Sequence, residues 1–355
     1  MPHAQNTDTN PDIAVSVNAF PFYVSSPAVF LPESLSTAKE AVADGKLTQD
    51  EADGLGIESV REAPGGSGPE LAVLAAGDTL RRSGFSGSEI SCLVHSWIHH
   101  SGHDLWSPAH YIAHQLDLRS CTPFGAQHLS NGAALSLDLA ASWLATHPGG
   151  HCLVTTGDVF PDHNFDRWAC DYGVVCGDGG TAALVSTTPV PDAITVHAVF
   201  HASLSDLEVM HRCGNPLGPV PDMYGKPIDI RRAKRAYFRQ YGTEAFASLS
   251  RDVIATVIRT ATGHGDRHLP GFSLADAYLP RIGRAGFDAT YAAPVQRLTG
   301  VVPRFHSNPS GHIGSGDLTA NCVEVLKDRT SRRRYSLMLS AGAGFTWTAM
   351  LVSTD

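Results

Sequence analysis

The sequence predicts an α/β protein made of two halves, each of which runs strand, helix, strand around one buried helix. In the first half, an apolar segment at 133–145 follows a strand at 91–98, and its apolar side chains recur on one helical face. The residues of that face are Ala133, Leu137, Ala140, Ala141 and Leu144. In the second half, a helix at 317–326 precedes strands at 335–340 and 346–352. The 355 residues allow one large domain or two ordinary ones.

Composition limits the classes of protein to which this chain can belong. Hydrophobic residues make up 43% of the chain and charged residues 17%, so a sizeable core is available and overall disorder is not expected. The formal net charge of −9 argues against a general nucleic-acid binder. No apolar run approaches the roughly 18 residues that span a bilayer, and the polar start at 2–11 lacks the apolar core of a signal peptide. We therefore expect a cytoplasmic protein with neither nucleic acid nor membrane as a partner.

Cysteines and histidines do not predict a metal site. The seven cysteines are scattered, odd in number and without a Cys-x-x-Cys pair, which is typical of reduced thiols in a cytosol. The densest group of histidines, at 97–103, lies beside Asp104 but lacks the spacing of metal ligands. Cys121 is an alternative lone nucleophile, although a buried free cysteine usually packs as a small hydrophobic residue.

Strands and helices alternate through the first half, 13–190, after a flexible tail at 1–12. Proline residues punctuate strands at 13–22 and 29–30. The helix at 69–83 carries an apolar stripe of Leu71, Leu74, Ala75 and Leu80. Pro108 suits the first turn of a helix at 107–116. The other elements expected here are short polar helices at 38–47 and 49–55, strands at 57–61, 89–98 and 151–156, a loop or short helix at 162–172, and a strand–turn–strand unit at 173–186.

The second half, 191–355, opens with a strand at 194–200, where apolar and polar residues alternate. The proline- and glycine-rich stretch 204–230 predicts a long irregular segment, of the kind often kept for binding. The other elements expected here are helices at 246–261, 289–298 and 317–326 and strands at 273–279, 302–305, 335–340 and 346–352.

The segment Gly125-Ala-Gln-His-Leu-Ser-Asn-Gly132 carries the first candidate for chemistry. Ser130 lies where irregular chain gives way to a helix, so backbone N–H groups there are unpaired and the helix dipole is positive. An alkoxide, or the oxyanion of a tetrahedral intermediate, would be stabilised at that place. The alternative is that Ser130 or Asn131 only caps the helix, a role that both residue types fill well.

Two glycine-rich turns near the C-terminus carry the second candidate. Ser310-Gly-His-Ile-Gly-Ser-Gly-Asp317 surrounds one histidine and one aspartate, and Ser340-Ala-Gly-Ala-Gly-Phe-Thr-Trp347 leads into an apolar strand. Ser130, His312 and Asp317 would form a nucleophile, a general base and an orienting carboxylate if the fold brings them together. Asp317 has the alternative role of capping the helix that follows it.

Together these segments resemble the ketoacyl-ACP synthase III branch of the thiolase superfamily. That family has a nucleophilic Cys-Ser-Gly at a strand-to-helix turn, where this chain has Ser130-Asn-Gly132. Its Gly-Asp-Gly-Ala-Gly turn matches Gly177-Asp-Gly-Gly-Thr181, its Gly-Asn-Thr-Ser matches Gly311-His-Ile-Gly314, and its final Gly-Gly-Gly-Phe-Thr-Trp matches Gly342-Ala-Gly-Phe-Thr-Trp347. The order and separations agree over nearly the whole chain. The resemblance implies a thiolase-like, five-layered αβαβα fold with two pseudo-duplicated halves, 13–190 and 191–355.

This chain departs from the family at the catalytic positions. Ser130 stands where the family has its nucleophilic cysteine, and His312 stands where it has an asparagine; a rival alignment places Asn308 there instead. The family's second histidine, in Pro-His-Gln-Ala-Asn, falls at 279–283, where this chain has no histidine. The Ser-for-Cys pattern is similar to that of synthase III-like proteins of daunorubicin-type polyketide pathways, which select an unusual starter unit.

The resemblance implies an acyltransferase that works through an acyl ester on Ser130. His312 would take the proton of the serine, Asp317 would orient His312, and the N–H groups of Ser130 and Ala343 would form the oxyanion hole. The donor would be a short acyl-CoA such as propionyl-CoA, used as a substrate, with no cofactor. The acceptor would be an acyl carrier protein or its malonyl unit, so that the reaction primes a polyketide. A homodimer is implied as well.

The resemblance also implies which residues surround the nucleophile. The stretch 97–103 would line the acyl pocket, and Trp106 would cross the dimer interface and close the partner's pocket, which favours a short acyl group. We also expect Asn131 and His211 in the substrate pocket. A basic run in this acidic chain contains Arg231, Arg232, Lys234 and Arg235. It forms either a solvated helix face or a docking site for an acidic carrier protein or a CoA phosphate.

Other functions stay open at this point. Acyl transfer to the hydroxyl or amine of a small molecule is chemistry that relatives of the family perform. A catalytically dead paralogue would only partner an active ketosynthase, although the retention of His312 and Asp317 argues against it. A plain α/β-hydrolase would need Gly-x-Ser-x-Gly, which the sequence around Ser130 lacks. Decarboxylative condensation is less expected than transfer, because a histidine occupies only one of the family's two enolate-stabilising positions.

Overall fold

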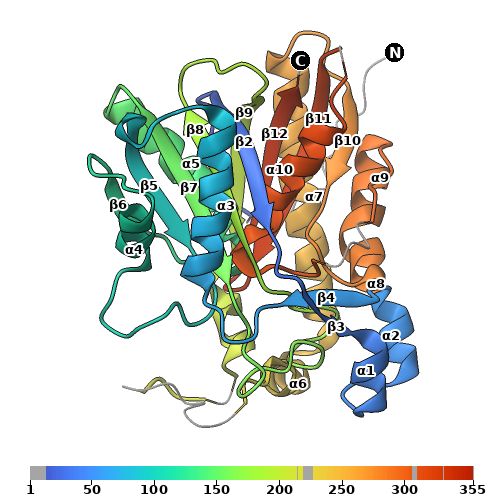
Figure 1. The fold of residues 1–355 in the computed structure, drawn as a ribbon. Helices are drawn as coiled ribbons and strands as arrows, with labels where there is room; N and C mark the ends of the chain where they lie inside the picture. The colour runs from blue at the N-terminus through green and yellow to red at the C-terminus, as the bar shows by residue number, and fades with distance from the viewer. Residues whose placement is uncertain (1–12, 214, 219–226, 306–309, 331, 355) are drawn as a thin grey trace, which may run out of the picture.

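The computed structural model describes residues 13–213, 215–218, 227–305, 310–330 and 332–354 (Figure 1). The expected tail and the rival residue Asn308 lie outside these ranges. The strands are β1 (Ser16–Asn18), β2 (Phe22–Phe30), β3 (Ser34–Thr37), β4 (Ser59–Glu62), β5 (Ile90–Ser96), β6 (Thr122–Gly125), β7 (His151–Asp158), β8 (Gly179–Ser186), β9 (Ile194–Ser203), β10 (Leu274–Tyr278), β11 (Arg334–Gly342) and β12 (Thr346–Thr354).

The α-helices of the described ranges are α1 (Ala38–Ala43), α2 (Gln49–Leu55), α3 (Gly68–Ser83), α4 (Pro108–Gln115), α5 (Gly132–Thr146), α6 (Ile230–Tyr241), α7 (Thr243–His268), α8 (Arg284–Gly286), α9 (Ala293–Thr299) and α10 (Asp317–Lys327). Shorter helical turns are η1 (Gly87–Glu89), η2 (Leu129–Asn131), η3 (Ser205–His211), η5 (Gly314–Gly316) and the π-helical η4 (Phe287–Ala292). Among the described residues, no helix is both long enough and apolar enough to cross a membrane.

The strand order of the main sheet repeats between the two halves of the chain. In the first half β2 pairs antiparallel with β8, β8 antiparallel with β7, and β7 parallel with β5. In the second half β9 pairs antiparallel with β12, β12 antiparallel with β11, and β11 parallel with β10. The halves join where β2 pairs with β9, and the described strands run in the order β10-β11-β12-β9-β2-β8-β7-β5-β6. The predicted fold class, with two pseudo-duplicated halves, is confirmed.

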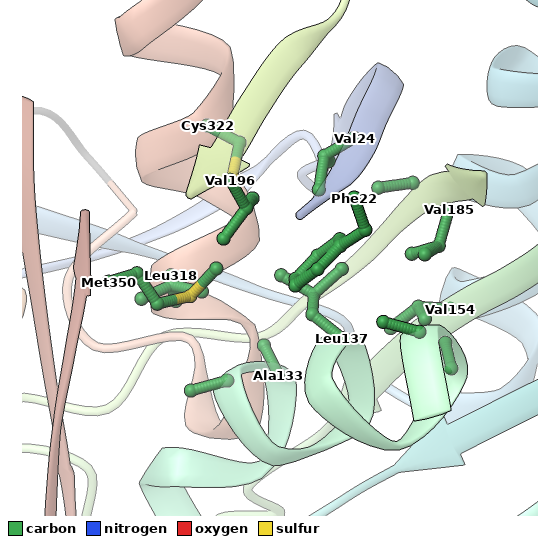
Figure 2. Close-up of a cluster of buried hydrophobic side chains, with 14 of the residues drawn as sticks. Phe22, Val24, Ala133, Leu137, Val154, Val185, Val196, Leu318, Cys322 and Met350 are labelled. Carbon is green, nitrogen blue, oxygen red and sulfur yellow. The ribbon is translucent and has the colours of Figure 1, made fainter. Parts of the chain in front are cut away.

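The helices α5 and α10 form the buried central layer between the strands of the two halves (Figure 2). Leu137 of α5 and Leu318 of α10 pack in one cluster with Phe22 of β2. Alternate residues of a strand serve opposite faces: Val154 of β7 packs into this cluster, whereas Leu153 packs beneath α3 and α4. Both faces of the sheet are therefore covered, which is why consecutive residues of its central strands are buried.

The outer layers are α3 and α4 over the strands of the first half and α7 over those of the second. The α3 stripe is only partly as predicted, because Leu71 is buried whereas Leu74 is half exposed. The expected strand at 302–305 is irregular chain, and the one at 13–22 is interrupted before β2. The short strand β6 was not predicted, because its four residues with a central proline carry no alternating pattern.

Candidate active site

Ser130 lies on η2, immediately before α5 begins at Gly132. The preceding residue, Leu129, has a φ of 49°, a left-handed conformation that a branched side chain rarely adopts. Asn131 is the N-cap residue of α5 but makes no capping hydrogen bond, and the hydroxyl of Ser130 bonds to His312 instead. Neither side chain therefore caps the helix, and Ser130 presents its hydroxyl at an open helix N-terminus.

His312 reaches Ser130 from the other half of the chain. Ser130 Oγ lies 2.8 Å from His312 Nε2, and His312 Nδ1 lies 2.7 Å from Asp317 Oδ2. A carboxylate only accepts hydrogen bonds, so Nδ1 carries the proton and Nε2 is left to accept the proton of the serine hydroxyl. The structure thus brings the three predicted residues together in the order nucleophile, base and carboxylate.

The segment that carries His312 is docked onto the first half by backbone hydrogen bonds. His312 N donates to Val175 O, and Gly177 N donates to His312 O, both at 2.9 Å. Gly311 has a φ of 57°, and a Cβ at that position would lie 2.8 Å from Val175 O. Glycine is required there because both the conformation and the close approach exclude a side chain.

Asp317 begins α10, but its carboxylate makes no cap of that helix. Oδ1 accepts from Ile313 N at 3.0 Å, and Oδ2 accepts from Arg281 N at 3.0 Å as well as from His312. Arg281 lies in the stretch that the sequence resemblance aligns with a second histidine. Its buried side chain donates to Asn321 and Ser310, so this stretch supports the carboxylate and adds no second imidazole.

The surroundings of His312 favour its protonated form. Burial by itself lowers the pKa of His312, but the adjacent Asp317 carboxylate outweighs burial and raises the pKa above its ordinary value. A higher pKa makes the imidazole a stronger base for the proton of Ser130 Oγ. His312 is almost fully buried, so water competes little for its two ring nitrogens.

The second glycine-rich turn lies directly against the nucleophile turn. Ala343 and Ser130 line the same cavity. A Cβ on Gly342 would lie 2.7 Å from His128 O and 2.8 Å from Asn131 N, so the two backbones touch at this point. This contact is what an oxyanion hole built from the N–H groups of Ser130 and Ala343 requires.

Gly342→Ala is expected to slow the reaction of Ser130 Oγ with an electrophile about 100-fold, because the added methyl group would displace η2, and a misplacement of about 1 Å has an effect of that size. The rate of labelling by a serine-directed sulfonyl fluoride, followed by intact-protein mass, checks this result. Gly77→Ala on α3 is the matched control, since nothing lies within 4 Å of a Cβ there. An unchanged rate for Gly342→Ala would contradict the functional importance of the contact.

A cavity of about 580 Å³ opens onto Ser130 and His312. Its walls come from both halves of the chain and are mainly apolar; they include Ile98, Phe160, Phe165, Phe246, Tyr291 and Trp347. Such walls suit the hydrocarbon part of a bound ligand. The stretch 97–103 contributes Ile98 and His99, as the family resemblance implied.

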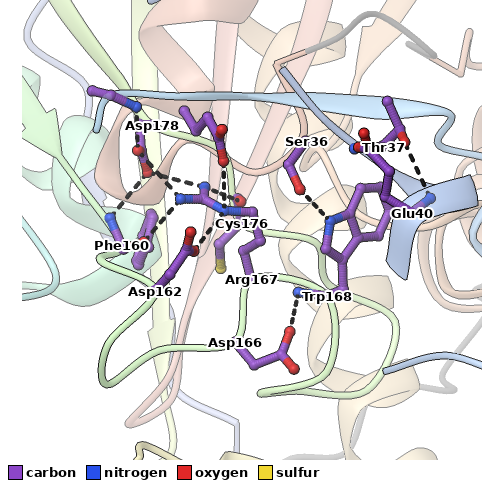
Figure 3. A network of polar contacts seen from close by, with 12 residues as sticks. Ser36, Thr37, Glu40, Phe160, Asp162, Asp166, Arg167, Trp168, Cys176 and Asp178 are labelled. Carbon is purple, nitrogen blue, oxygen red and sulfur yellow. Dashed lines mark hydrogen bonds and ion pairs between the residues drawn. The ribbon is translucent and has the colours of Figure 1, made fainter. Parts of the chain in front are cut away.

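One aromatic wall of the cavity is held by a buried arginine (Figure 3). Arg167 donates to Phe160 O at 2.9 Å and to Asp178 Oδ1 at 3.2 Å, and Phe160 N donates to the same oxygen at 2.9 Å. The ring of Phe160 packs on that of Phe165, with centroids 4.8 Å apart. No local sequence pattern indicates this wall, because its members come together only through the folding of the loop before β8.

His211 lines the cavity, as predicted. Burial, together with the positive charge of Lys234, lowers the pKa of His211 to about 4, so its imidazole is neutral near pH 7. His211 Nε2 and His99 Nε2 have no hydrogen-bond partner among the described residues. Both residues line the cavity, but these two nitrogens are themselves buried and face away from its open space.

Two other expected pocket residues lie elsewhere. Asn131 is fully buried behind the cavity and does not line it, because its side chain turns toward β12 and bonds to Thr348. Trp106 is 38% exposed and packs on Tyr111 and His103, outside the cavity of its own chain. The role of Trp106 in a partner's pocket stays a prediction.

Helix α6 divides the basic run into two groups. Arg231 pairs with Glu51 at 3.1 Å and Lys234 with Asp171 at 2.6 Å, and both basic side chains are largely buried. Lys234 lines the cavity. Arg232 and Arg235 lie on the exposed face. Docking of an acidic partner stays a prediction, and the exposed face offers it only Arg232 and Arg235, because the other face of this amphipathic helix packs against the protein.

Cys121 and Cys176 are poorer candidates than Ser130 for the nucleophile. Cys121 packs under α4 on the outer side of the sheet, where burial raises its pKa to about 12. Cys176 lines the cavity, but a hydrogen bond with Cys170 and burial hold its pKa well above the ordinary value. A thiol that stays protonated is a weak nucleophile. Within the described ranges, no three His, Cys, Asp or Glu side chains form a group that could hold a metal ion.

Comparison with solved structures places this geometry on a known architecture. The chain is 22% identical to ChlB3, described as an acyltransferase, with a TM-score of 0.81 over 94% of this chain and 97% of that one. It is 16% identical to AbyA1, a tetronic acid condensing enzyme, with a TM-score of 0.68 over 93% and 99% of the two chains. It is 18% identical to 3-oxoacyl-[acyl-carrier-protein] synthase III from Aquifex aeolicus VF5, with a TM-score of 0.71 over 94% and 100%.

No protein-family model matches the chain, and no curated protein matches it either. The solved structures agree with it over nearly their whole lengths, and the repeated strand order of the two halves fits the same architecture. The chain therefore has the thiolase-like fold of 3-oxoacyl-[acyl-carrier-protein] synthase III.

Proposed function

We propose that this protein is an acyltransferase that carries its acyl group as an ester on Ser130. The hydrogen-bonded series Ser130–His312–Asp317, with distances of 2.8 and 2.7 Å, supports this proposal most strongly. The series borders an apolar cavity that suits an acyl chain. Proteins of similar fold include one named as an acyltransferase and one named as a condensing enzyme, and both names fit acyl chemistry.

The first step loads the enzyme. His312 Nε2 takes the proton of Ser130 Oγ while Oγ attacks the carbonyl carbon of a thioester donor. The resulting oxyanion accepts hydrogen bonds from the N–H groups of Ser130 and Ala343. The carbon–sulfur bond then breaks, and the proton passes from His312 to the departing thiolate. Asp317 stabilises the imidazolium that exists between these two events.

The second step unloads the enzyme by the same groups in reverse order. His312 takes the proton of the acceptor nucleophile as it attacks the ester carbonyl, and the same oxyanion hole stabilises the second tetrahedral intermediate. The bond to Ser130 Oγ breaks, and His312 returns the proton to the serine. Each step forms one acyl bond and breaks one, so no further reagent is needed.

Transfer is favoured over decarboxylative condensation. An enolate left by decarboxylation needs hydrogen-bond donors around its oxygen, and the related family supplies a histidine and an asparagine. Here the stretch 279–283 contributes a backbone N–H group to Asp317, and its Arg281 side chain is engaged elsewhere. Both ring nitrogens of His312 are already hydrogen-bonded, one to Ser130 and one to Asp317. The site therefore provides a nucleophile and a general base, but no histidine–asparagine pair to stabilise an enolate.

The donor and acceptor complete the proposal. The donor is a short acyl-CoA such as propionyl-CoA, and the acceptor is the thiol of an acyl carrier protein, so that the enzyme primes polyketide synthesis as a cytoplasmic homodimer. A second candidate acceptor is the hydroxyl or amine of a small molecule. The size of the cavity, about 580 Å³, favours it, because a small acceptor fits inside together with a short acyl group. A dead paralogue is disfavoured by the complete hydrogen-bonded series.

Intact-protein mass after incubation with a panel of acyl-CoAs of increasing chain length tests the function. Wild type should gain the mass of one acyl group, and Ser130→Ala should gain none. Ser250→Ala, a serine of the same cavity, is the matched control and should load normally. A mass gain that persists in Ser130→Ala would move the nucleophile to another residue and refute the assignment. If no acyl-CoA or acyl-carrier protein loads the wild type, the chain is not an acyltransferase.

A further inference from the structure

A second series of polar side chains lies behind Ser130, on the side away from the cavity. Asn131 Nδ2 lies 2.8 Å from Thr348 Oγ1, and Thr348 Oγ1 lies 2.8 Å from His201 Nδ1. His201 Nε2 lies 3.1 Å from Asp138 Oδ2, and Asp138 also accepts from Asn18. We call the four residues Asn131, Thr348, His201 and Asp138 the rear relay. None of the four lines the cavity.

The carboxylate of Asp138 sets the direction of every hydrogen bond in the rear relay. A carboxylate only accepts, so in the neutral imidazole His201 Nε2 carries the proton and His201 Nδ1 is an acceptor. The hydroxyl of Thr348 must then donate to Nδ1, which leaves its lone pairs to accept from Asn131 Nδ2. The amide of Asn131 is therefore held in one orientation by a carboxylate that lies three side chains away.

The rear relay joins the nucleophile helix to the opposite half of the chain. Asn131 and Asp138 are seven residues apart, which places both on one side of α5 about two turns from each other. Thr348 of β12 and His201 of β9 are direct partners across an antiparallel pair in the second half. Two neighbouring strands of the second half therefore form hydrogen bonds with α5 at Asn131 and at Asp138. Asn131 is next to Ser130.

The turn that carries Ser130 is not fixed by local interactions alone, so it needs contacts from elsewhere in the chain. Leu129 is in a left-handed conformation that costs free energy and persists only where the surroundings impose it. The start of α5 has no side-chain cap that would fix it locally. Asn131 and Thr348 are both fully buried, and a buried polar series is costly to keep unless it specifies one arrangement. An apolar pair would fill this space without those requirements.

We propose that the rear relay positions the nucleophile. It fixes the side chain of Asn131, and through it the backbone of η2, so that Ser130 Oγ stays in line with His312, which belongs to the other half. The four residues are positioning residues, because none touches the cavity. The inference rests on the proposed function only in that acyl transfer uses Ser130.

Thr348→Val and Thr348→Ser separate this role from ordinary packing. Valine keeps the shape of threonine but removes the hydroxyl, whereas serine keeps the hydroxyl and removes a methyl group. Phenylmethylsulfonyl fluoride is the probe: Ser130 Oγ forms a bond to sulfur, fluoride leaves, and His312 takes the proton, so no acyl donor is needed. We expect the labelling rate of Thr348→Val to fall 10- to 100-fold and that of Thr348→Ser to stay within threefold of wild type.

Hydrogen–deuterium exchange of the peptides that cover 126–137 gives a readout that is independent of any reaction. Faster exchange is expected in Thr348→Val, with the rest of the chain unchanged, and wild-type exchange in Thr348→Ser. The proposal would be overturned if the labelling rate fell equally in both variants. It would also be overturned if Thr348→Val kept the wild-type labelling rate and the wild-type exchange. A wild type that reacts with the sulfonyl fluoride but accepts no acyl group would refute the proposed function alone. If the wild type does not react with the sulfonyl fluoride, the exchange rates of 126–137 in the two Thr348 variants alone support or overturn the proposal.

Discussion

His312→Gln is expected to slow the acylation of Ser130 by a factor on the order of 10⁴ to 10⁶, the size of effect seen when the base of a catalytic triad is removed. Glutamine fills much of the space of histidine and keeps a polar group near Ser130 Oγ. In the wild type this oxygen lies 2.8 Å from His312 Nε2. Glutamine has no basic site near pH 7, so the serine would have to lose its proton to water in a buried pocket. The loss therefore reports proton transfer and not a missing side chain.

Single-turnover acylation, measured by intact-protein mass at saturating donor, checks this prediction. His110→Gln is the matched control, since His110 is exposed on α4 and bonds only locally, to Ser107. The control should load at the wild-type rate. If His312→Gln kept more than one tenth of the wild-type rate, the general base would have to be another residue.

Asp317→Asn is expected to slow acylation about 10⁴-fold, because a neutral amide does not stabilise the imidazolium of His312 as a carboxylate does. Asp317 accepts hydrogen bonds from Ile313 N on one oxygen and from His312 Nδ1 and Arg281 N on the other. An asparagine has one acceptor oxygen for these three donors, so its NH₂ group must face at least one of them. It also carries no charge to offset the positive imidazolium that forms when His312 takes the proton of Ser130 Oγ.

The pH dependence of the same variant gives a second test, and its sign follows from the causes of the pKa shift. The neutral imidazole is the base, so the wild-type rate should be low below the pKa of His312 and level off above it. That pKa is raised by Asp317 against the effect of burial. Without the carboxylate, burial remains and lowers the pKa, so the inflection of the residual rate should move to lower pH.

Asp328→Asn is the matched control for the charge change. Asp328 follows the other end of α10, where it accepts from Tyr278 and Arg304, far along the helix from His312. It should change neither the rate nor the inflection. An Asp317→Asn protein with the wild-type pH profile would contradict the electrostatic role of the carboxylate.

Local sequence was enough to indicate what each half contributes to the site. Ser130 stands at the start of a helix, and His312 and Asp317 are five residues apart around a glycine-rich turn, so their placement depends mostly on nearby backbone. The short apolar or small-residue stretches of β7 and β8 go with strands whose residues are buried on both faces of the sheet. These features depend on interactions within a few residues, which is why the sequence predicts them.

Side-chain direction on the helices was not available from the same patterns. Asn131 was expected in the pocket and turns instead to Thr348, and Lys234 was expected at a docking surface and turns instead to Asp171. In both cases the outcome depends on which strand or loop packs against that helix. Arg281 went unnoticed as a supporter of Asp317, because its contribution is a backbone N–H group that carries no sequence signal.

The sequence by itself determined the α/β class, the two helices of the central layer and the three residue types of the site, because periodicity, glycine turns and helix starts are local properties of the chain. Only the tertiary structure decided that Ser130 and His312, 182 residues apart, lie within hydrogen-bond distance. That distance depends on the pairing of β2 with β9, on the docking of the His312 segment onto the first half, and on the hydrogen bonds from β9 and β12 to α5. Each is a contact between segments far apart in the sequence, and its geometry is fixed by packing and not by any one segment.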